Sequence, residues 1–291
     1  MVNFRKIDCR MPEISIYTLE YIVAPRKKVQ LLYWVGALFR NNLLYAAASI
    51  DVGDGRSLLD VIQSTDNLLP RGYSLQCDPI FDRTSLSTRN HLSLKIRLFG
   101  NFSAYAQYFH AAVLGMCGRG IGTPQTPFSI LDCRNYRSEI PFDLRTFSRD
   151  RLLMRFVTPV SIYNGRAKPL AKRNSLDMQN GMPGLYFTIR SLVRRINKLQ
   201  YTYEGGELWS DGQVDEWCMQ AREAQLEECS LRRIVLEGPP RQTAERPIYF
   251  KGYVGHAVYS GVDEKYLPLL WQGTETNVGN DTVYGMGQYL L

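Results

Sequence analysis

The sequence has few histidines, no paired cysteines and no long hydrophobic run, and each absence excludes a class of protein. No stretch approaches the roughly 18 to 20 uncharged apolar residues that span a membrane. The N-terminal residues also lack the apolar core of a signal peptide. We therefore expect a soluble protein of the cytoplasm, where its six unpaired cysteines would stay reduced.

Metal and nucleotide sites are also not indicated. The cysteines form no Cys-x-x-Cys pair and have no histidine at ligand spacing, so the sequence predicts neither zinc nor a disulfide framework. No Gly-Lys-Ser/Thr motif occurs, and the glycine loop Gly118–Gly122 comes after a helical pattern and before a strand pattern. This order is wrong for dinucleotide and Walker loops, so we expect no cofactor.

The composition of the sequence is typical of a globular protein. Of 291 residues, 45% are hydrophobic and 22% are charged, which is enough to bury a sizeable core. The length suits one large domain or two smaller ones. We favour two, residues 1–147 and 148–291, with the junction in the stretch 145–150.

Positive charge is concentrated in one segment. Between Arg166 and Lys198, eight Lys and Arg residues face the single acid Asp177, so the local excess equals the net charge of +7 of the whole chain. Such a field attracts polyanions, although a solvated basic surface is an equal alternative. A smaller cluster includes Lys27 and Lys28, whereas acids gather between Glu204 and Glu228 in what we interpret as a solvent-facing insertion or helix.

Hydrophobic periodicity predicts the same order of elements in both halves. Apolar residues alternate with polar ones from Leu92 to Leu98, which is typical of a strand with one buried face. Helical spacing of apolar residues predicts helices over 30–48, 103–116, 185–199 and 265–271. Short apolar runs predict further strands over 14–23, 128–133, 152–160, 232–236 and 248–254. The repeat of this order favours an α+β fold of two tandem ferredoxin-like (βαββαβ, RRM-like) units, with a C-terminal glycine-rich loop from Gly273 to Gly287.

Several segments then resemble a known family, the CRISPR repeat-processing endoribonucleases of the RAMP superfamily, called the Cas-six family. In the C-terminal half these segments are Met154–Val160, Leu185–Leu199, Phe250–Gly255 and the glycine pattern Gly273-x5-Gly279-x5-Gly285-Met-Gly287. In the N-terminal half, Ile96–Gly100 and Gly118–Gly122, followed by Pro127-Phe128, are similar to the first unit of that family.

The resemblance implies a protein that binds the repeat of a CRISPR precursor transcript and cuts it without a metal. The 2′-hydroxyl of the RNA attacks the adjacent phosphate and leaves a 2′,3′-cyclic phosphate. This reaction needs a base, an acid and cations for the developing charge. Partners would be precursor and mature crRNA, together with subunits of a CRISPR effector complex.

Catalytic candidates are few because the family often carries a histidine on or near its first helix and this sequence has none there. Tyr33, Gly36 and Arg40 would share one helical face and offer a hydroxyl and a guanidinium to the scissile phosphate. The alternative is that Tyr33 packs in the core and Arg40 is solvated. Of the three histidines, His256 follows a strand-like run and is the candidate for proton transfer, the alternative being a structural hydrogen bond.

RNA contacts are predicted from charge and from the glycine loop. Arg190 and Arg194 lie one helical turn apart and could follow a phosphate backbone. The RNA-binding candidates are Lys27, Lys28, Arg166, Lys168, Lys172, Arg173, Arg190, Arg194, Arg195, Asn277 and Asn280. Two other functions remain open: a non-catalytic RAMP subunit that only holds guide RNA, and an RNA-binding protein unrelated to CRISPR.

Overall fold

The computed structural model describes most of the chain. The described residues are 12–64, 66, 69–81, 83–138, 151–162, 178–179, 182–240 and 247–291. The proposed junction at 145–150 lies outside them. No helix among these residues is long and apolar enough to cross a membrane.

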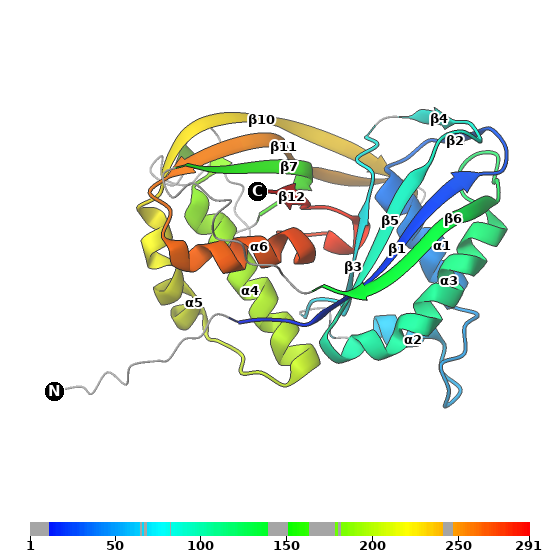
Figure 1. The fold of residues 1–291 in the computed structure, drawn as a ribbon, viewed down its shortest axis with the longest axis horizontal. Helices are drawn as coiled ribbons and strands as arrows, with labels where there is room; N and C mark the ends of the chain where they lie inside the picture. Colours follow the sequence, from blue (N-terminus) through cyan, green and yellow to red (C-terminus); the bar gives the residue numbers. More distant parts are fainter. Residues whose placement is uncertain are drawn as a thin grey trace.

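The N-terminal half is built around a four-stranded antiparallel sheet in the order β3-β5-β1-β6. Two helices, α1 and α3, cover one face of it (Figure 1). The elements are β1 (Ile16–Pro25), β2 (Val29–Leu31), α1 (Val35–Ala47), α2 (Leu58–Gln63), β3 (Tyr73–Cys77), β4 (Thr84–Leu86), β5 (Leu92–Phe99), α3 (Ala106–Arg119) and β6 (Phe128–Arg137). The strand expected over Leu92–Leu98 is confirmed, with its leucines buried as the alternation requires.

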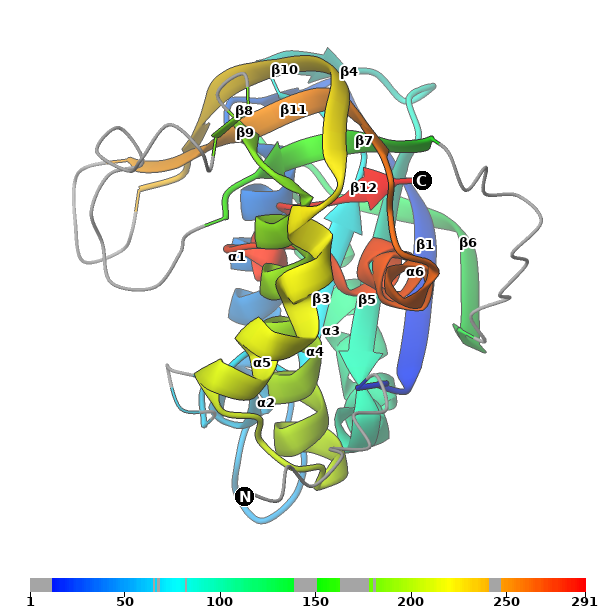
Figure 2. The same ribbon diagram turned by 90° about the vertical axis from the view of Figure 1, so that its left-hand side faces the viewer.

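The C-terminal half contains a second four-stranded antiparallel sheet, in the order β10-β11-β7-β12. Its strands arch over α4 and α6 (Figure 2). The elements are β7 (Leu152–Val160), β8 (Met178–Gln179), β9 (Met182–Pro183), α4 (Leu185–Glu204), α5 (Asp211–Cys218), β10 (Gln225–Gly238), β11 (Ile248–Ser260), α6 (Leu267–Thr276) and β12 (Tyr289–Leu290). The expected mixture of helices with antiparallel sheets is therefore confirmed.

The first helix is shorter than the periodicity predicts. Residues 30–34 do not join it, because Leu31 pairs with Thr84 in the small β2–β4 ribbon and the backbone N–H of Trp34 donates to the carbonyl of Glu237, 2.9 Å away. The helix begins at Val35 with no side-chain cap. Tyr33 consequently precedes the helix and does not share the face of Arg40.

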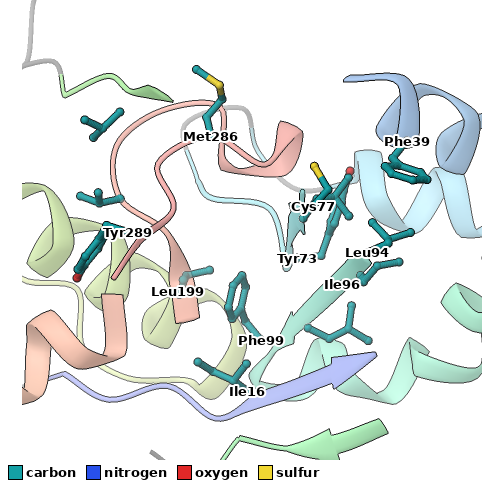
Figure 3. Packing of buried hydrophobic residues seen from close by; sticks show 14 of the residues in the cluster. Ile16, Phe39, Tyr73, Cys77, Leu94, Ile96, Phe99, Leu199, Met286 and Tyr289 are labelled. Carbon is teal, nitrogen blue, oxygen red and sulfur yellow. The ribbon is translucent and has the colours of Figure 1, made fainter. Parts of the chain in front are cut away.

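One hydrophobic core runs through both halves. Figure 3 shows Tyr73, Cys77 and Ile96 of the N-terminal sheet together with Leu199 of α4 and Met286 from the C-terminal half. Each of these side chains is buried, and burying one apolar side chain of this size stabilises the fold by about 1.5–3 kcal/mol. The halves are therefore held together mainly by shared apolar packing.

Polar contacts also cross between the halves. The guanidinium of Arg97, which is buried in β5, pairs with Glu275 of α6 at 2.7 Å. The hydroxyl of Tyr203 donates to the carbonyl of Pro70 at 3.1 Å, and the side-chain amide of Asn277 donates to the carbonyl of Leu75 at 3.1 Å. Each of these three polar side chains thereby forms a hydrogen bond or ion pair with a group in the other half.

The segment Asn277–Gln288, which we call the C-terminal loop, docks directly on α1. The indole N–H of Trp34 donates to the carbonyl oxygen of Tyr284 at 2.7 Å. Gly36 allows this approach, since a Cβ atom at that position would lie 2.0 Å from the same carbonyl oxygen. A close backbone contact between residues far apart in sequence thus sets the position of the loop.

Gly36→Ala should therefore destabilise the protein. Alanine favours helix over glycine by about 1 kcal/mol, but the clash should outweigh this gain and cost about 1–3 kcal/mol in total. Denaturant unfolding measures the difference. Gly118→Ala is the matched control, since it lies in α3 and a Cβ there meets nothing within 4 Å. Equal stability changes in the two variants would contradict the close-contact argument.

Candidate nucleic-acid interface

The basic residues of α4 form a row along one face of the helix. Arg190, Arg194 and Lys198 are each four residues apart and so lie one turn above one another. The opposite face is apolar, with residues such as Ile189 and Leu192 fully buried. The amphipathic pattern of α4 therefore turns these three cations away from the core.

The acids of α5 hold two of these cations. Asp215 accepts hydrogen bonds from the guanidinium of Arg190, and Asp211 pairs with Arg194 at 2.6 Å. Figure 2 shows α5 lying in front of α4. The hydrogen bond from Arg190 lowers the pKa of Asp215 below its usual value. The sequence interpretation assigned no chemistry to these acids, yet they partly neutralise the basic row.

A capping box fixes the start of α5 and hence the position of its acids. The hydroxyl of Ser210 accepts from the backbone N–H of Gln213, and the Gln213 side chain accepts from the N–H of Ser210. Because the helix starts here, Asp211 and Asp215 lie one turn apart and face successive turns of α4.

A cavity of about 410 Å³ opens between α4, the C-terminal loop and the turn before β3. Five cationic side chains line it, and the loop adds an amide and a carboxylate. These residues are Arg71, Arg190, Arg194, Arg195, Lys198, Asn280 and Asp281. The cavity thus joins cations from both halves of the chain at one place.

Two buried guanidinium N–H groups at this cavity have no acceptor among the described residues. They are Nε of Arg194 and one terminal nitrogen of Arg195, and both residues contribute to the lining. Buried donors usually find an acceptor. An anion with several oxygens, such as a phosphate, is the ligand that the five cationic side chains of the lining favour.

Arg195 otherwise belongs to the interior. Its Nε donates to the carbonyl of Thr276 at 2.9 Å, and its guanidinium carbon lies 5.8 Å from the centroid of the Phe99 ring. Burial lowers its pKa to about 10. The structure therefore separates Arg195 from the row of Arg190, Arg194 and Lys198, with which the sequence analysis grouped it.

The two asparagines of the C-terminal loop have different surroundings. Asn277 is fully buried at a positive φ of 60°, with its amide bonded to Leu75. This contact joins the two halves, so Asn277 does not meet the expectation of an RNA-facing residue. Asn280 is exposed and lines the cavity, and its backbone N–H donates to Ser161 at 3.0 Å.

Arg40 contacts the C-terminal loop and does not share a face with Tyr33. One of its terminal nitrogens donates to the hydroxyl of Tyr284 at 3.0 Å, and its guanidinium carbon lies 4.2 Å from the centroid of that ring. Its Nε is buried without a partner among the described residues. Tyr33 is half-buried against the core. The aromatic partner of Arg40 was therefore missed, because it lies 244 residues away along the chain.

Asp281 lies near Arg40 and also lines the cavity of about 410 Å³. It holds a left-handed backbone conformation with φ of 58°, which non-glycine residues rarely adopt. Burial raises the pKa of its carboxyl, while the nearby charge of Arg40 acts in the opposite direction. A carboxyl group and a guanidinium thus lie close to each other where α1 meets the loop.

None of the three histidines lies at this corner. His91 is exposed before β5, and His110 of α3 shares a hydrogen bond of 3.0 Å with Tyr21. His256 lies six residues along β11 from Phe250, whose ring packs on Tyr284. At 3.3 Å per residue this is about 20 Å, so the structure does not bring His256 together with Arg40 as the sequence analysis expected.

The remaining candidates lie elsewhere. Lys27 and Lys28 are exposed in the turn between β1 and β2 and do not line the cavity of about 410 Å³. The other four lie outside the described residues: Arg166, Lys168, Lys172 and Arg173. The described residues also hold no group of three or more His, Cys, Asp and Glu side chains arranged to bind a metal.

Comparison with known proteins identifies a related family for part of the chain. Residues 154–289 match the family of CRISPR-associated endoribonuclease Cas6. This range contains all four C-terminal segments on which the sequence resemblance rests. No curated protein matches the sequence.

Solved structures are similar in fold over nearly the whole chain. A Cas6 product complex matches with a TM-score of 0.56 and 14% identity, covering 95% of this chain and 98% of that chain. Cas6 of Thermus thermophilus matches with a TM-score of 0.53 and 13% identity, covering 96% and 98%. A partial Cas6–RT–Cas1–Cas2 complex gives a TM-score of 0.62 at 10% identity, covering 95% of this chain and 46% of that chain. At these identities the likeness shows a shared fold.

The different surroundings of two neighbouring arginines give a stability prediction. Arg195→Ala should lower the free energy of unfolding by about 1–3 kcal/mol, because the buried carbonyl of Thr276 loses its donor. Arg194→Ala should cost less than about 1 kcal/mol, because its partner Asp211 is largely exposed. Denaturant unfolding of both variants tests this order, and a larger loss for Arg194→Ala would contradict it.

Proposed function

We propose that the protein is a member of the Cas6 family, whose model matches residues 154–289, and that it binds the repeat of a CRISPR precursor transcript and cuts it. The observation that carries the proposal is the cavity of about 410 Å³ where cations of α4, Arg71 and the C-terminal loop meet. The five cationic side chains of its lining favour an anionic ligand there.

The proposed reaction is a transesterification that needs no metal. The 2′-oxygen of one nucleotide attacks the adjacent phosphorus, and the bond from phosphorus to the 5′-oxygen of the next nucleotide breaks. A base takes the proton from the 2′-hydroxyl and an acid gives one to the leaving 5′-oxygen. The products are a 2′,3′-cyclic phosphate and a 5′-hydroxyl.

We assign the charge-stabilising role to Arg40. Its guanidinium is held against Tyr284, so it is ordered before substrate arrives and can stabilise the charge that develops on the phosphate oxygens. The hydroxyl of Tyr284 would then deliver the proton to the leaving oxygen. Tyr33 is half-buried and would support the position of α1 rather than contact the phosphate.

Asp281 is the group that we propose as the base. No histidine lies where α1 meets the C-terminal loop, and Asp281 provides a carboxylate at that corner that both lines the cavity and interacts with Arg40. Its raised pKa brings its basicity closer to what proton abstraction requires near neutral pH.

The finer description of the fold is also a proposal. Each sheet places its strands in the order second, third, first, fourth, with a helix after the first strand and another after the third. This order supports two tandem ferredoxin-like units, residues 1–147 and 148–291, the second ending in a glycine-rich loop. The neighbours include a Cas6 product complex and a Cas6–RT–Cas1–Cas2 complex, which supports crRNA and CRISPR proteins as partners here.

The alternative function is a subunit that holds guide RNA without cutting it. The observation that favours it is the absence of histidine from the corner of Arg40 and Tyr284. Both functions use the same cationic cavity, so binding alone does not separate them.

Incubation of the purified protein with labelled CRISPR repeat RNA in EDTA separates these functions. We expect one cut that leaves a cyclic phosphate, mapped on a sequencing gel with end analysis. Tight binding without a cut would favour the guide-holding subunit, and the absence of both would overturn the family-based proposal. In the same assay Arg40→Ala should lower the single-turnover rate about 100-fold with a smaller loss of binding.

Arg40→Lys is the control that retains the charge, and unfolding measurements show whether either variant is folded. Equal losses of rate and affinity in Arg40→Ala would mean that Arg40 only binds the RNA backbone and does not stabilise the transition state.

The proposed base gives a pH prediction. A carboxylate acts as a base only when deprotonated, so the single-turnover rate should rise with pH through a pKa above the usual value of about 3.9 for aspartate and then level off. Asp281→Asn should be slower and should lose this rise, while asparagine tolerates the left-handed backbone. An unchanged pH profile in Asp281→Asn would remove the residue from the mechanism.

A further inference from the structure

The outer face of the C-terminal sheet carries a second cavity, away from α4. Its volume is about 930 Å³, and its walls come from β7, β10 and β11. The register of the strands aligns Arg155 of β7, His256 of β11 and Ser230 of β10 in one row across the sheet. The neighbouring row pairs Val254 with Arg232. Cross-strand partners share a face, so His256 lies between two arginines.

Close pairing with β10 fixes the backbone of β11 directly before His256. The register between β11 and β7 shifts between Tyr253 and Gly255, where β7 carries the extra residues, whereas the pairing of β11 with β10 continues unbroken through His256. Gly255 has a φ of 123°, and a Cβ there would lie 2.0 Å from the carbonyl of Ser230. The close strand pairing at this point therefore requires glycine directly before His256.

The charge of this face is positive and largely uncompensated. Glu228 pairs with Arg151. Arg155 and Arg232 are exposed and form no ion pair with any residue that the structure describes. Leu153 adds an exposed apolar side chain on β7. Two free guanidinium groups on either side of an imidazole, with apolar surface beside them, suit a ligand with alternating phosphates and flat bases.

We propose that this face binds a single-stranded segment of RNA, with one base stacked on His256 and the flanking phosphates held by Arg155 and Arg232. A base can stack on a side chain only when it is unpaired, so single strands are favoured over duplex. The inference rests on the proposed function in that its ligand is RNA. It assigns His256 to binding, in place of the catalytic role expected from the sequence.

The two cavities can belong to one RNA path. Arg155 lines the second cavity and Ile162 lines the first. Seven residues separate them along β7 and its continuation, which is at most about 23 Å at 3.3 Å per residue. A few nucleotides of single strand cover such a distance. The face would therefore hold nucleotides that flank the segment at the cationic cavity of α4.

The test uses the full chain and fluorescein-labelled oligouridylate, which forms no duplex. Fluorescence anisotropy should show about tenfold weaker binding for His256→Ala, the loss of one stacked base, and a similar loss for the Arg155→Ser, Arg232→Ser double variant. His256→Phe should restore binding because it retains a flat ring. Arg233→Ser is the matched control from the same strand, where alternation directs the side chain to the opposite face; it should change binding by less than about twofold.

Three results would overturn the inference: unchanged binding in His256→Ala, an equal loss in Arg233→Ser, or crosslinks of 4-thiouridine RNA to α4 and the C-terminal loop only. The last result is the one expected if this face binds another protein and not RNA. Repeat cleavage by the Arg233→Ser control should match the wild-type rate. If the wild-type protein cuts repeat RNA while the variants bind oligouridylate normally, this inference fails and the proposed function stands. If the wild-type protein binds no RNA, both fail.

Discussion

The contact between the C-terminal loop and α1 positions the groups of the proposed catalytic corner. Gly36 lets the carbonyl of Tyr284 approach the helix, and Trp34 donates a hydrogen bond to it. This one contact sets Tyr284 beside Arg40, near Asp281, which lines the cationic cavity. The site therefore depends on backbone fit as much as on its charged side chains, since a displaced loop would separate groups that come from opposite halves of the chain.

The electrostatics of α4 depend on a neighbour of opposite charge. Asp211 and Asp215 pair with the two arginines of the basic row, which keeps the side chains ordered in the absence of ligand. A bound polyanion must then compete for these arginines with two carboxylates that α5 holds in place. A single phosphate gains little from such an exchange, whereas a chain of phosphates contacts several cations at once, so this arrangement favours long anions over small ones.

Local patterns predicted much of the fold, and long-range contacts account for what they missed. Alternation identified β5, and the amphipathic pattern identified α4 within a few residues of its observed bounds. Helical spacing overestimated α1 because it could not detect the pairing of Leu31 with another strand. The clustering of Arg40 with Tyr284 could not be predicted, because periodicity carries no information about residues 244 positions apart. For the same reason Asn277, polar and in a glycine-rich segment, gave no sign that it would be buried between the halves.

The position of the C-terminal loop in the chain has a consequence for how the protein forms during synthesis. The ribosome completes the N-terminal half long before residues 277–288 emerge, and domains generally begin to fold in that order. Until then the surface of α1 around Gly36 and Trp34 has no partner, and the shared core lacks Met286 and Tyr289. The nascent protein therefore exposes this apolar surface until residues 277–288 have been synthesised.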